Sequence, residues 1–354
     1  MVKIALNGFG RTARTAFRAY LLSHTQAAQV VAINTSGSMD TSGWAYLLQY
    51  DTAQGIFSLP VTFKDVKPAS EATDADPLIG YLTISGHDYP LLAQRDPAKL
   101  PWGKYGAQVV IEATGAFRKP EEASAHLSAG AQRVLISAPP KGDHKAQIGM
   151  YLLGVNEYQG KGDIVSSASC TTNCVAPVLA VMQAKFGVVK AMMTTVHGYT
   201  DDQRLQDNSH KDLRRARAAA LNIIPTDTGA ATATTQVIPE LKDKFDGLAI
   251  RVPVASGSLS DFVFLTKENI TIEAVNQAFI EASQEPRWQG ILATTTEPLV
   301  SSDIIGRSES AIVDLNFTNV VDGNLVKVLA WYDNEWGYSN RLIEQAIAIG
   351  KTLA

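Results

Sequence analysis

Both cysteines of the 354-residue chain lie in one short stretch, SASCTTNCVAP, from Ser167 to Pro177. Cys170 and Cys174 are four residues apart. Two thiols on one helix face are rarely oriented for a disulfide, and two ligands alone make a poor zinc site, so we expect neither a disulfide nor a metal. Two interpretations remain: a pair of buried thiols, or a nucleophile with a packed neighbour.

The residues around the two cysteines favour different roles for them. The apolar spacing after Cys174 predicts a helix with a buried stripe, formed by Val175, Val178, Leu179, Met182 and Phe186. Cys174 lies one turn into this helix and suits a buried position. Cys170 opens the helix directly after a predicted strand, DIVSSAS. The positive end of a helix dipole favours a thiolate, so Cys170 is a candidate nucleophile.

A nucleophilic thiol needs a base, and His197 is the candidate. It lies near the end of an apolar predicted strand, VVKAMMTTVHGYT, which follows the Cys170 helix. This strand is expected to run back beside the helix, and imidazole is the usual partner of a catalytic thiol. Most lone histidines are surface or satisfied core residues, so position alone leaves that alternative open.

A glycine turn at the start of the chain predicts a dinucleotide site. Gly8, Gly10 and Ala13 match the Gly-x-Gly-x-x-Gly/Ala fingerprint between a buried strand and a helix. Gly8 permits the tight turn, Gly10 lets the backbone approach a pyrophosphate, and the helix N-terminus faces the anion. Together with a thiol–imidazole pair, this site predicts aldehyde oxidation: thiolate addition, hydride loss and an acyl thioester.

The turn after the second predicted strand, QVVAIN, bears on the choice of cofactor. An Asp or Glu normally ends this strand when the ribose carries a free 2′-hydroxyl. Here the turn consists of Thr35, Ser36, Gly37 and Ser38. These residues could donate hydrogen bonds to a 2′-phosphate; alternatively the turn is simply polar and Asp40 reaches back to the ribose.

Alternating strands and helices through the first half predict a doubly wound parallel sheet of the Rossmann type. Further strands are expected at AQVVIEATG and QRVLISAP, and Gly115 and Ser137 lie at their ends, where such folds bind ligands. The length suggests two domains. A net charge of −4 gives no reason to expect nucleic acid or a membrane as the main partner. Two cysteines, and a strand pattern starting at the second residue, suggest a cytoplasmic protein.

The second half carries groups that suit an anionic substrate. These are Thr200 and Asp202 in HGYTDDQR, Thr228 and Gly229 in IPTDTGAA, and Arg251 in LAIRVP. Taken singly, each is more often a cap or turn residue. The basic stretch HKDLRRARAAALN, with Lys211, Arg214, Arg215 and Arg217, reads as a solvated or interface helix, because no aromatic residues interleave with its charges.

Six motifs in order span nearly the whole chain: NGFGR, SASCTTNC, HKDLRRARAA, IIPTDTGAA, RVPV and WYDNEWGYSNR. In this combination the chain is similar to the phosphorylating glyceraldehyde-3-phosphate dehydrogenases. The resemblance implies oxidation of glyceraldehyde 3-phosphate to 1,3-bisphosphoglycerate, with NADP or NAD as the hydride acceptor and inorganic phosphate as the second substrate.

The same resemblance implies a role for each matching residue. Cys170 is the nucleophile, and His197 is the acid/base that steadies the thiohemiacetal oxygen. The substrate's own phosphate is assigned to Thr200, Asp202 and Arg251, and the attacking phosphate to Ser169, Thr171, Thr228 and Gly229. The cofactor is assigned to Gly8, Gly10, Arg11 and Thr12 at the pyrophosphate, and to Asn334 and Tyr338 at the nicotinamide.

The family organisation implies a dinucleotide-binding domain over residues 1–168, rejoined by a C-terminal helix at 335–354, and an α+β catalytic domain over 169–334. Family members are cytoplasmic homotetramers. In them an S-loop, here about 200–225, lines a neighbour's cofactor pocket.

Two departures from the family pattern favour NADP, with NAD also used. Thr35 replaces the usual Asp after the second strand, and Asn208-Ser209 replaces the Leu-Pro typical of NAD-dependent members. Ser209 is therefore expected to reach the 2′-phosphate along with Thr35 and Ser36. Thr12-Ala13 replaces the usual Ile-Gly, and Thr232 replaces a usual lysine.

Three other functions compete with this one. Erythrose-4-phosphate dehydrogenase shares the thiol chemistry, although Thr200 and the unbroken TDTGAA favour the triose enzyme. A thiol acyltransferase or hydrolase would need no hydride step, which leaves the glycine turn unexplained. A non-catalytic binding protein, gripping RNA through the dinucleotide pocket, would leave the thiol–imidazole pair unexplained.

Overall fold

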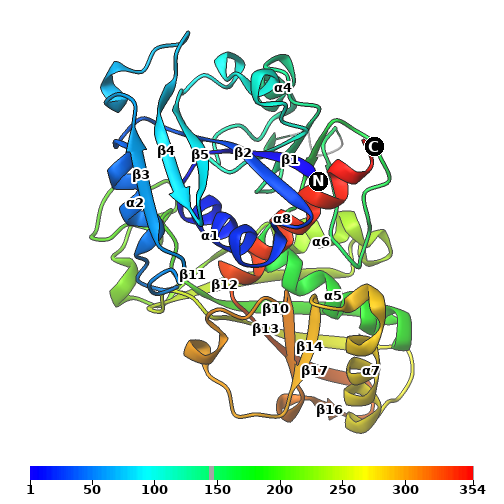
Figure 1. The fold of residues 1–354 in the computed structure, drawn as a ribbon. Coiled ribbons are helices and arrows are strands. Elements are labelled where there is room, and N and C mark those ends of the chain that lie inside the picture. Colours follow the sequence, from blue (N-terminus) through cyan, green and yellow to red (C-terminus); the bar gives the residue numbers. More distant parts are fainter. Residues whose placement is uncertain (143–146, 354) are drawn as a thin grey trace. The chain divides into compact units, whose positions relative to one another are not determined.

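The computed structural model describes residues 1–142 and 147–353, and it divides into two compact units. The first contains residues 1–151 and 158–168 together with the C-terminal part of the chain from Ser339. The second contains residues 152–157 and 169–338. Each unit has its own sheet and helices (Figure 1).

The sheet of the first unit is mostly parallel. Strand β1 lies between β2 and β6, and the antiparallel pair β3–β4 extends one edge. The strands follow the order β3 (Val61–Asp65), β4 (Leu78–Ile84), β5 (His87–Ala93), β2 (Ala28–Thr35), β1 (Val2–Asn7), β6 (Val109–Glu112), β7 (Arg133–Ile136), β9 (Ile164–Ser166) and β8 (Gly149–Met150). Reversal of strand order on either side of β1 is the switch point of a doubly wound sheet.

Helices cover this sheet with apolar residues. They are α1 (Arg11–Ala19), α2 (Thr41–Gln49), α3 (Trp102–Tyr105), α4 (Pro120–Ser128) and α8 (Trp336–Lys351). From Ser339 onward α8 belongs to this unit, and Leu342, Ile343 and Ala346 are fully buried in its core. The last helix therefore completes a core begun by the first strand.

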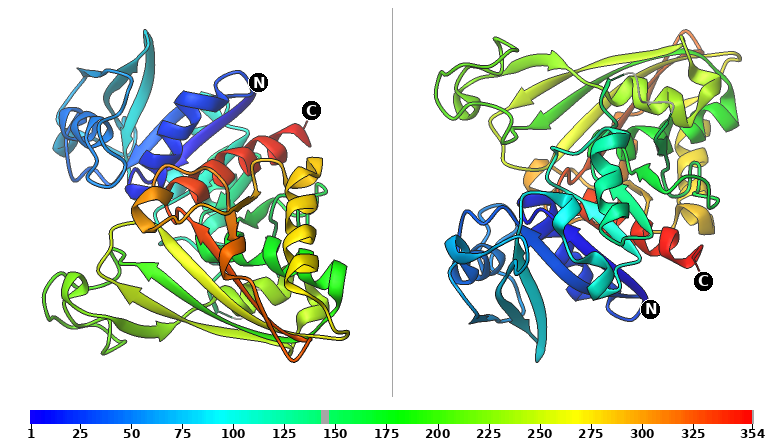
Figure 2. Two further views of the ribbon diagram at one scale, coloured as in Figure 1. Left: turned by 90° about the horizontal axis from the view of Figure 1, so that it is seen from below. Right: turned by 90° about the horizontal axis from the view of Figure 1, so that it is seen from above.

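The second unit pairs a mixed sheet with three helices (Figures 1 and 2). Its strands follow the order β11 (Ile224–Asp227), β12 (Phe245–Val252), β10 (Val188–Gly198), β13 (Ser258–Thr266), β17 (Leu325–Tyr332), β15 (Ala311–Asp314) and β14 (Leu292–Thr295), with β16 (Asn319–Val321) beside β17. The helices are α5 (Cys170–Phe186), α6 (Ala230–Val237) and α7 (Ile272–Gln284). This is the expected α+β arrangement.

Three expectations differ from the observed partition or local structure. Residues 152–157, expected in the first domain, group with the second unit; a Cβ on Gly154 would lie 2.7 Å from the carbonyl oxygen of Arg287, so the chain packs tightly there. Residues 335–338 also group with the second unit, where a Cβ on Gly337 would lie 2.8 Å from the carbonyl oxygen of Glu309.

The third difference is the basic stretch from His210 to Asn222. It forms turns with a short 3₁₀ segment at Ala219–Leu221 instead of the expected helix. Side chains hold the turns: Arg217 Nε donates to Asp207 at 2.7 Å, and Arg215 Nη1 donates to Asp202 at 2.6 Å. Side-chain hydrogen bonds of this kind offer the backbone an alternative to a helix.

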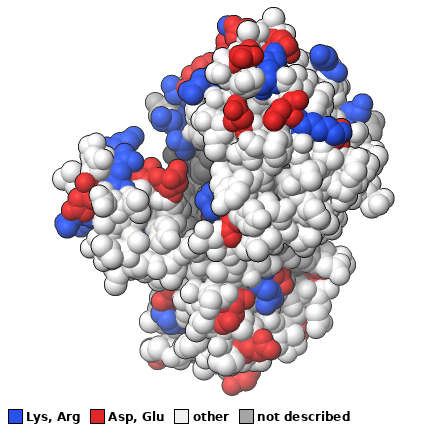
Figure 3. Space-filling model, turned by 60° about the vertical axis from the view of Figure 1, so that its left-hand side comes forward, with Lys and Arg blue, Asp and Glu red and all other residues white. Residues whose placement is uncertain are grey.

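Charges on the surface are mixed in sign. On the face shown in Figure 3, basic and acidic side chains are interspersed. Among the described residues, no helix combines the length and apolar character needed to cross a membrane.

Candidate active site

The two thiols have different surroundings. Strand β9 ends at Ser166, and a tight turn with Ala168 at φ +57° leads to Ser169. Ser169 caps α5 by accepting the backbone N–H of Thr172 at 3.1 Å, so Cys170 is the first helical residue. Cys170 is half-buried, whereas Cys174 is fully buried. The left-handed conformation of Ala168, two positions before Cys170, is a strained feature of the kind that clusters at functional sites.

The structure brings Cys170 and His197 together. Cys170 Sγ lies 3.5 Å from His197 Nε2, and His197 is only 3% exposed. Parallel pairing of β10 and β12 sets Arg251 beside His197 in register, with Arg251 Nη1 2.6 Å from His197 Nδ1. Nδ1 also lies 2.7 Å from the Gly198 carbonyl oxygen. A guanidinium only donates and a carbonyl only accepts, so these two neighbours of Nδ1 favour opposite tautomers of the neutral imidazole. The other ring nitrogen, Nε2, faces the thiol.

Burial and charge set the proton affinities of this pair. Burial, followed by the positive charge of Arg251, lowers the pKa of His197 from 6.5 to about 3. Burial raises the pKa of the Cys170 thiol, and the guanidinium of Arg251 opposes that rise. His197 is thus neutral near pH 7, and Arg251 is the main positive charge available to stabilise a thiolate.

Replacing Arg251 with glutamine is expected to slow alkylation of Cys170 by iodoacetamide at neutral pH. The substitution removes the charge that opposes the rise, so the pKa of the thiol increases and the thiolate fraction at any pH below it falls. The rate-against-pH curve should move to higher pH. As a control, Arg307→Gln removes a charge from an arginine paired with Glu309 and should leave the curve in place. An unshifted curve in the Arg251 variant would contradict this assignment.

The residues expected at the substrate phosphate are not equivalent. Arg251 Nε is buried and has no hydrogen-bond partner among the described residues, so an anion would satisfy it. Asp202 instead accepts from Arg215 Nη1 at 2.6 Å. Burial by itself would raise the pKa of the Asp202 carboxyl, but the hydrogen bond and the positive charge of Arg215 outweigh burial and lower the pKa. The carboxylate in turn orients the arginine. The Thr200 backbone N–H donates to Gln203 Oε1 at 3.2 Å, and Gln203 Nε2 is buried and unpaired within the described residues.

Sequence reasoning missed Arg215 and Gln203 as members of this group. Arg215 was hidden in a basic stretch, and its signal would have been the pairing of Arg215 with Asp202 across thirteen residues. Gln203 is only 6% exposed, which marks it as unusual for a loop glutamine.

The residues expected at the attacking phosphate begin two neighbouring helices. Ser169 and Thr171 lie at the start of α5, where Thr171 Oγ1 is 3.9 Å from Cys170 Sγ. Thr228 and Gly229 precede α6, and a Cβ on Gly229 would meet nothing within 4 Å. Helices α5 and α6 pack against each other. Open backbone amides at a helix start suit an anion.

The glycine turn of the first unit fits a dinucleotide. Gly8 has φ +90°, and a Cβ there would lie 2.9 Å from Thr114 Cγ2. A Cβ on Gly10 would face open space, and α1 begins at Arg11 without a side-chain cap. The start of α1 thus lacks a side-chain cap, as a pyrophosphate site requires. The Arg11 guanidinium is paired with Asp51 at 3.1 Å.

Gly115 and Ser137 lie where parallel strands end. Gly115 follows β6 with φ +74° and open space around it, and the Ser137 N–H donates to the Glu112 carbonyl at 2.9 Å. In the second unit Asn334 Oδ1 accepts from Ser258 Oγ at 2.7 Å, which turns its amide NH₂ away from Ser258. Tyr338 is 7% exposed.

The turn after β2 differs in detail from its expected role. Thr35 is 1% exposed, and its hydroxyl donates to the Leu92 carbonyl at 2.9 Å, so that proton joins β2 to β5. Asp40 Oδ1 accepts the Ala69 N–H at 2.6 Å, which holds its carboxylate to the β3–β4 connection. Ser36 is exposed, as is Ser209 in the second unit.

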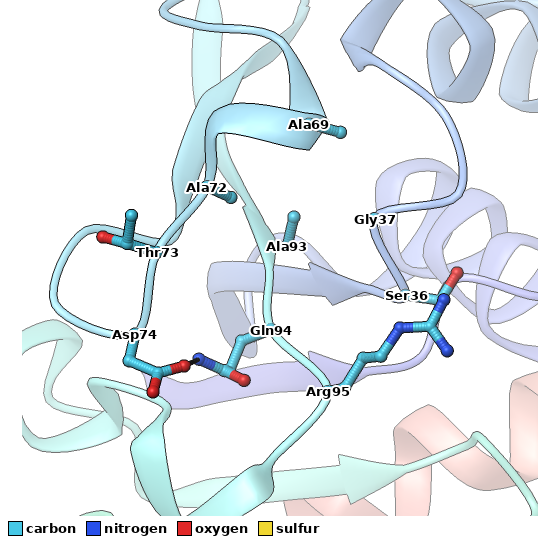
Figure 4. A pocket seen from close by; sticks show the side chains of 9 residues that line it. All are labelled: Ser36, Gly37, Ala69, Ala72, Thr73, Asp74, Ala93, Gln94 and Arg95. Carbon is cyan, nitrogen blue, oxygen red and sulfur yellow. Dashed lines mark hydrogen bonds between the residues drawn. The ribbon is translucent and has the colours of Figure 1, made fainter.

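A pocket of about 280 Å³ adjoins this turn (Figure 4). Ser36 and Gly37 line one side, and Arg95, which sequence reasoning missed, extends its side chain next to Ser36. Asp74 lines the other side and accepts from Gln94 Nε2 at 3.0 Å. The arginine comes from the end of β5 and not from the turn itself, so a search confined to that turn overlooked it.

A Rossmann-type unit with an open glycine turn, and a second unit with a half-buried thiol beside a buried imidazole, together fit the class of NAD(P)-dependent dehydrogenases. Two family models match the chain. "Glyceraldehyde 3-phosphate dehydrogenase, NAD binding domain" matches residues 2–120, and "Glyceraldehyde 3-phosphate dehydrogenase, C-terminal domain" matches residues 169–334.

Curated relatives agree along the full length. The chain is 46% identical over 355 residues to glyceraldehyde-3-phosphate dehydrogenase 2 of Streptomyces avermitilis, with 99% of each chain covered. It is also 46% identical over 354 residues to the glyceraldehyde-3-phosphate dehydrogenase of Zymomonas mobilis, again with 99% of each covered. Glyceraldehyde-3-phosphate dehydrogenase 1 of Bacillus cereus is 46% identical over 349 residues, with 98% of each covered. The chain belongs to the glyceraldehyde-3-phosphate dehydrogenase family.

Proposed function

We propose that the protein reversibly oxidises D-glyceraldehyde 3-phosphate with inorganic phosphate to 1,3-bisphosphoglycerate, with NADP or NAD as the hydride acceptor. The observation that carries this proposal is the 3.5 Å approach of Cys170 Sγ to His197 Nε2 at the start of α5, with Arg251 on the other side of the imidazole. A thiol, a buried N–H donor and a fixed positive charge are the parts of covalent aldehyde oxidation.

The chain's own residues divide the chemistry between them. The Cys170 thiolate adds to the aldehyde carbon, and the resulting oxyanion accepts the Nε2–H of His197. The nicotinamide of the bound cofactor supplies the acceptor for the hydride that leaves this carbon. The acyl thioester left on Cys170 is then attacked by a phosphate oxygen, and the sulfur departs as a thiolate. These steps start from the thiolate, whose proton has passed to solvent before the aldehyde adds, and from there each step balances.

Two groups of residues would separate the two phosphates. The substrate's phosphate is proposed to lie on Thr200 and Arg251, with Asp202 acting through Arg215. The attacking phosphate is proposed to lie near Thr171 and Ser169 on α5 and Thr228 and Gly229 before α6. The first assignment is supported by Arg251 Nε, a buried donor that has no hydrogen-bond partner among the described residues and that a phosphate oxygen would satisfy.

The first experiment compares kcat/KM for both cofactors with glyceraldehyde 3-phosphate and inorganic phosphate, followed by the absorbance of the reduced nicotinamide. Activity with erythrose 4-phosphate but not with the triose would move the assignment to erythrose-4-phosphate dehydrogenase. Activity without any hydride transfer would favour a thiol hydrolase instead.

We further propose that NADP is used alongside NAD, with NADP favoured. No carboxylate ends β2, Asp40 is held by Ala69 N–H, and Arg95 lies beside Ser36 in the adjoining pocket. A guanidinium next to a serine hydroxyl suits a phosphate monoester. The buried Thr35 would then support the turn, and Ser36 and Arg95 would make the contacts, with Ser209 of the S-loop as a further candidate.

Replacing Arg95 with glutamine is expected to lower kcat/KM for NADP about 10- to 100-fold, because a charge-assisted hydrogen bond is lost. The value for NAD should change less than about threefold, since NAD lacks the 2′-phosphate. Lys104→Gln removes the same charge from an exposed site on α3 and should affect neither cofactor selectively. Equal losses for both cofactors in the Arg95 variant would rule out a 2′-phosphate contact.

The proposed partner of the chain is a further copy of itself, as in a homotetramer. Large apolar side chains are exposed on adjacent strands of the second sheet: Met192 on β10 is 66% exposed and faces Val263 on β13, which is 37% exposed. Leu205 and Leu213 in the 200–225 segment are 83% and 80% exposed. Sedimentation analysis measures the state directly. The cytoplasm remains the predicted compartment.

A further inference from the structure

Four buried hydroxyl groups form a row behind the thiol–imidazole pair. Tyr332, at the end of β17, is 1% exposed, and its hydroxyl lies 2.8 Å from Thr195 Oγ1 on β10. On its other side it lies 3.1 Å from Thr171 Oγ1 on α5. Ser260 Oγ on β13 donates to Thr195 Oγ1 at 3.3 Å. The row therefore connects three strands of the sheet to the residue after Cys170.

The hydrogen bonds of this row fix the place of the Thr171 hydroxyl. Thr195 Oγ1 lies 2.8 Å from the Tyr332 hydroxyl and 3.5 Å from the Leu259 carbonyl, which can only accept. Between two hydroxyls either oxygen can donate, so the bond between Tyr332 and Thr171 can run in either direction. In both directions it holds the Thr171 hydroxyl in one orientation, 3.9 Å from Cys170 Sγ.

Tyr332 also contacts the imidazole. Its ring centroid lies 6.0 Å from that of His197, with an interplanar angle of 73°. Burial raises the pKa of the Tyr332 phenol, so its hydroxyl stays protonated and remains a donor across the working range. The ring of Tyr332 thus contacts His197, whereas its hydroxyl contacts Thr171.

We infer that Tyr332 is a positioning residue for the phosphate-dependent step: its hydroxyl, hydrogen-bonded to Thr171 Oγ1 at 3.1 Å, holds the threonine hydroxyl in place to contact the inorganic phosphate that attacks the thioester. This inference rests on the proposed function, in which Thr171 contacts that phosphate. It assigns Tyr332 no contact with substrate or cofactor. Its ring supports His197, and its hydroxyl acts through Thr171.

The test compares two kinetic measurements on Tyr332→Phe, which keeps the ring and removes the hydroxyl. The KM for inorganic phosphate is expected to rise about five- to tenfold, because one neutral hydrogen bond that orients Thr171 is lost. The rate of the first turnover, measured as the burst of reduced nicotinamide before phosphate acts, should fall less than about threefold. A purely structural role would instead weaken both steps equally.

A matched pair at the other end of the row keeps the inference testable if the Phe variant folds poorly. Thr195→Val removes the hydroxyl that lies 2.8 Å from the Tyr332 hydroxyl and should raise the phosphate KM, whereas Thr195→Ser keeps a hydroxyl there and should leave the phosphate KM unchanged. An unchanged phosphate KM in Tyr332→Phe and Thr195→Val, or equal losses in both kinetic steps, would overturn the inference. Absence of any burst in the unaltered protein would overturn the proposed function itself, independently of these variants.

Discussion

Replacing Cys170 with serine is expected to lower kcat/KM with glyceraldehyde 3-phosphate by about 10⁴-fold or more, because a serine hydroxyl at this position is a far weaker nucleophile than a thiolate. The Cys170 thiol lies at the start of α5, and its sulfur is 3.5 Å from His197 Nε2. The measurement is the absorbance of reduced nicotinamide in the presence of inorganic phosphate. The burst of the first turnover should vanish along with the steady rate.

Cys174 provides the matched control. It lies on the same helix but is fully buried, and its Sγ is 4.0 Å from the Ala330 carbonyl. Cys174→Ala should keep kcat within a few-fold and destabilise the fold by about 1–2 kcal/mol through the cavity it leaves. Near-normal activity in Cys170→Ser, or an inactive but folded Cys174→Ala variant, would contradict the assignment of Cys170 as the nucleophile and Cys174 as a packed residue.

Replacing His197 with asparagine is expected to lower kcat about 10²- to 10⁴-fold. The asparagine carbonyl can still accept from Arg251 in place of Nδ1, but nothing replaces Nε2, which lies 3.5 Å from Cys170 Sγ and is proposed to donate to the oxyanion. The oxyanion formed on addition of the thiolate therefore loses its donor. Rapid-mixing measurement of the first turnover isolates this step from the later attack of phosphate.

Thiol reactivity supplies a second readout on the same variant. Loss of the Nε2–H removes a donor to the thiolate, so alkylation of Cys170 at neutral pH should slow as well. Tyr332→Phe, which leaves the imidazole in place, is the comparison variant. If His197→Asn reacted with iodoacetamide as fast as the unaltered protein and kept its first turnover, His197 would have no part in the chemistry.

The sequence by itself determined the local features of this protein. The glycine turn between β1 and α1, the strand–turn–helix around Cys170 and the buried position of Cys174 all follow from residues within about a dozen positions of each other. Backbone conformation at Gly8 and the cap at Ser169 depend on nearest neighbours, so composition and spacing predict them. The six motifs then identified the family, which the family models and the relatives confirm.

Tertiary structure decided which distant side chains meet. Arg251 reaches His197 across 54 positions because β10 and β12 pair in one particular register. Tyr332 reaches Thr171 across 161 positions through the order of β10, β13 and β17. Arg95 lies beside Ser36 because the ends of β2 and β5 are adjacent in the sheet.

Distant contacts also explain why the helix expected from His210 to Asn222 does not form. The Arg215 side chain hydrogen-bonds to Asp202 and Thr226, and these bonds hold the segment in turns. Register and strand order depend on packing across the whole sheet, and no local stretch of sequence contains that information.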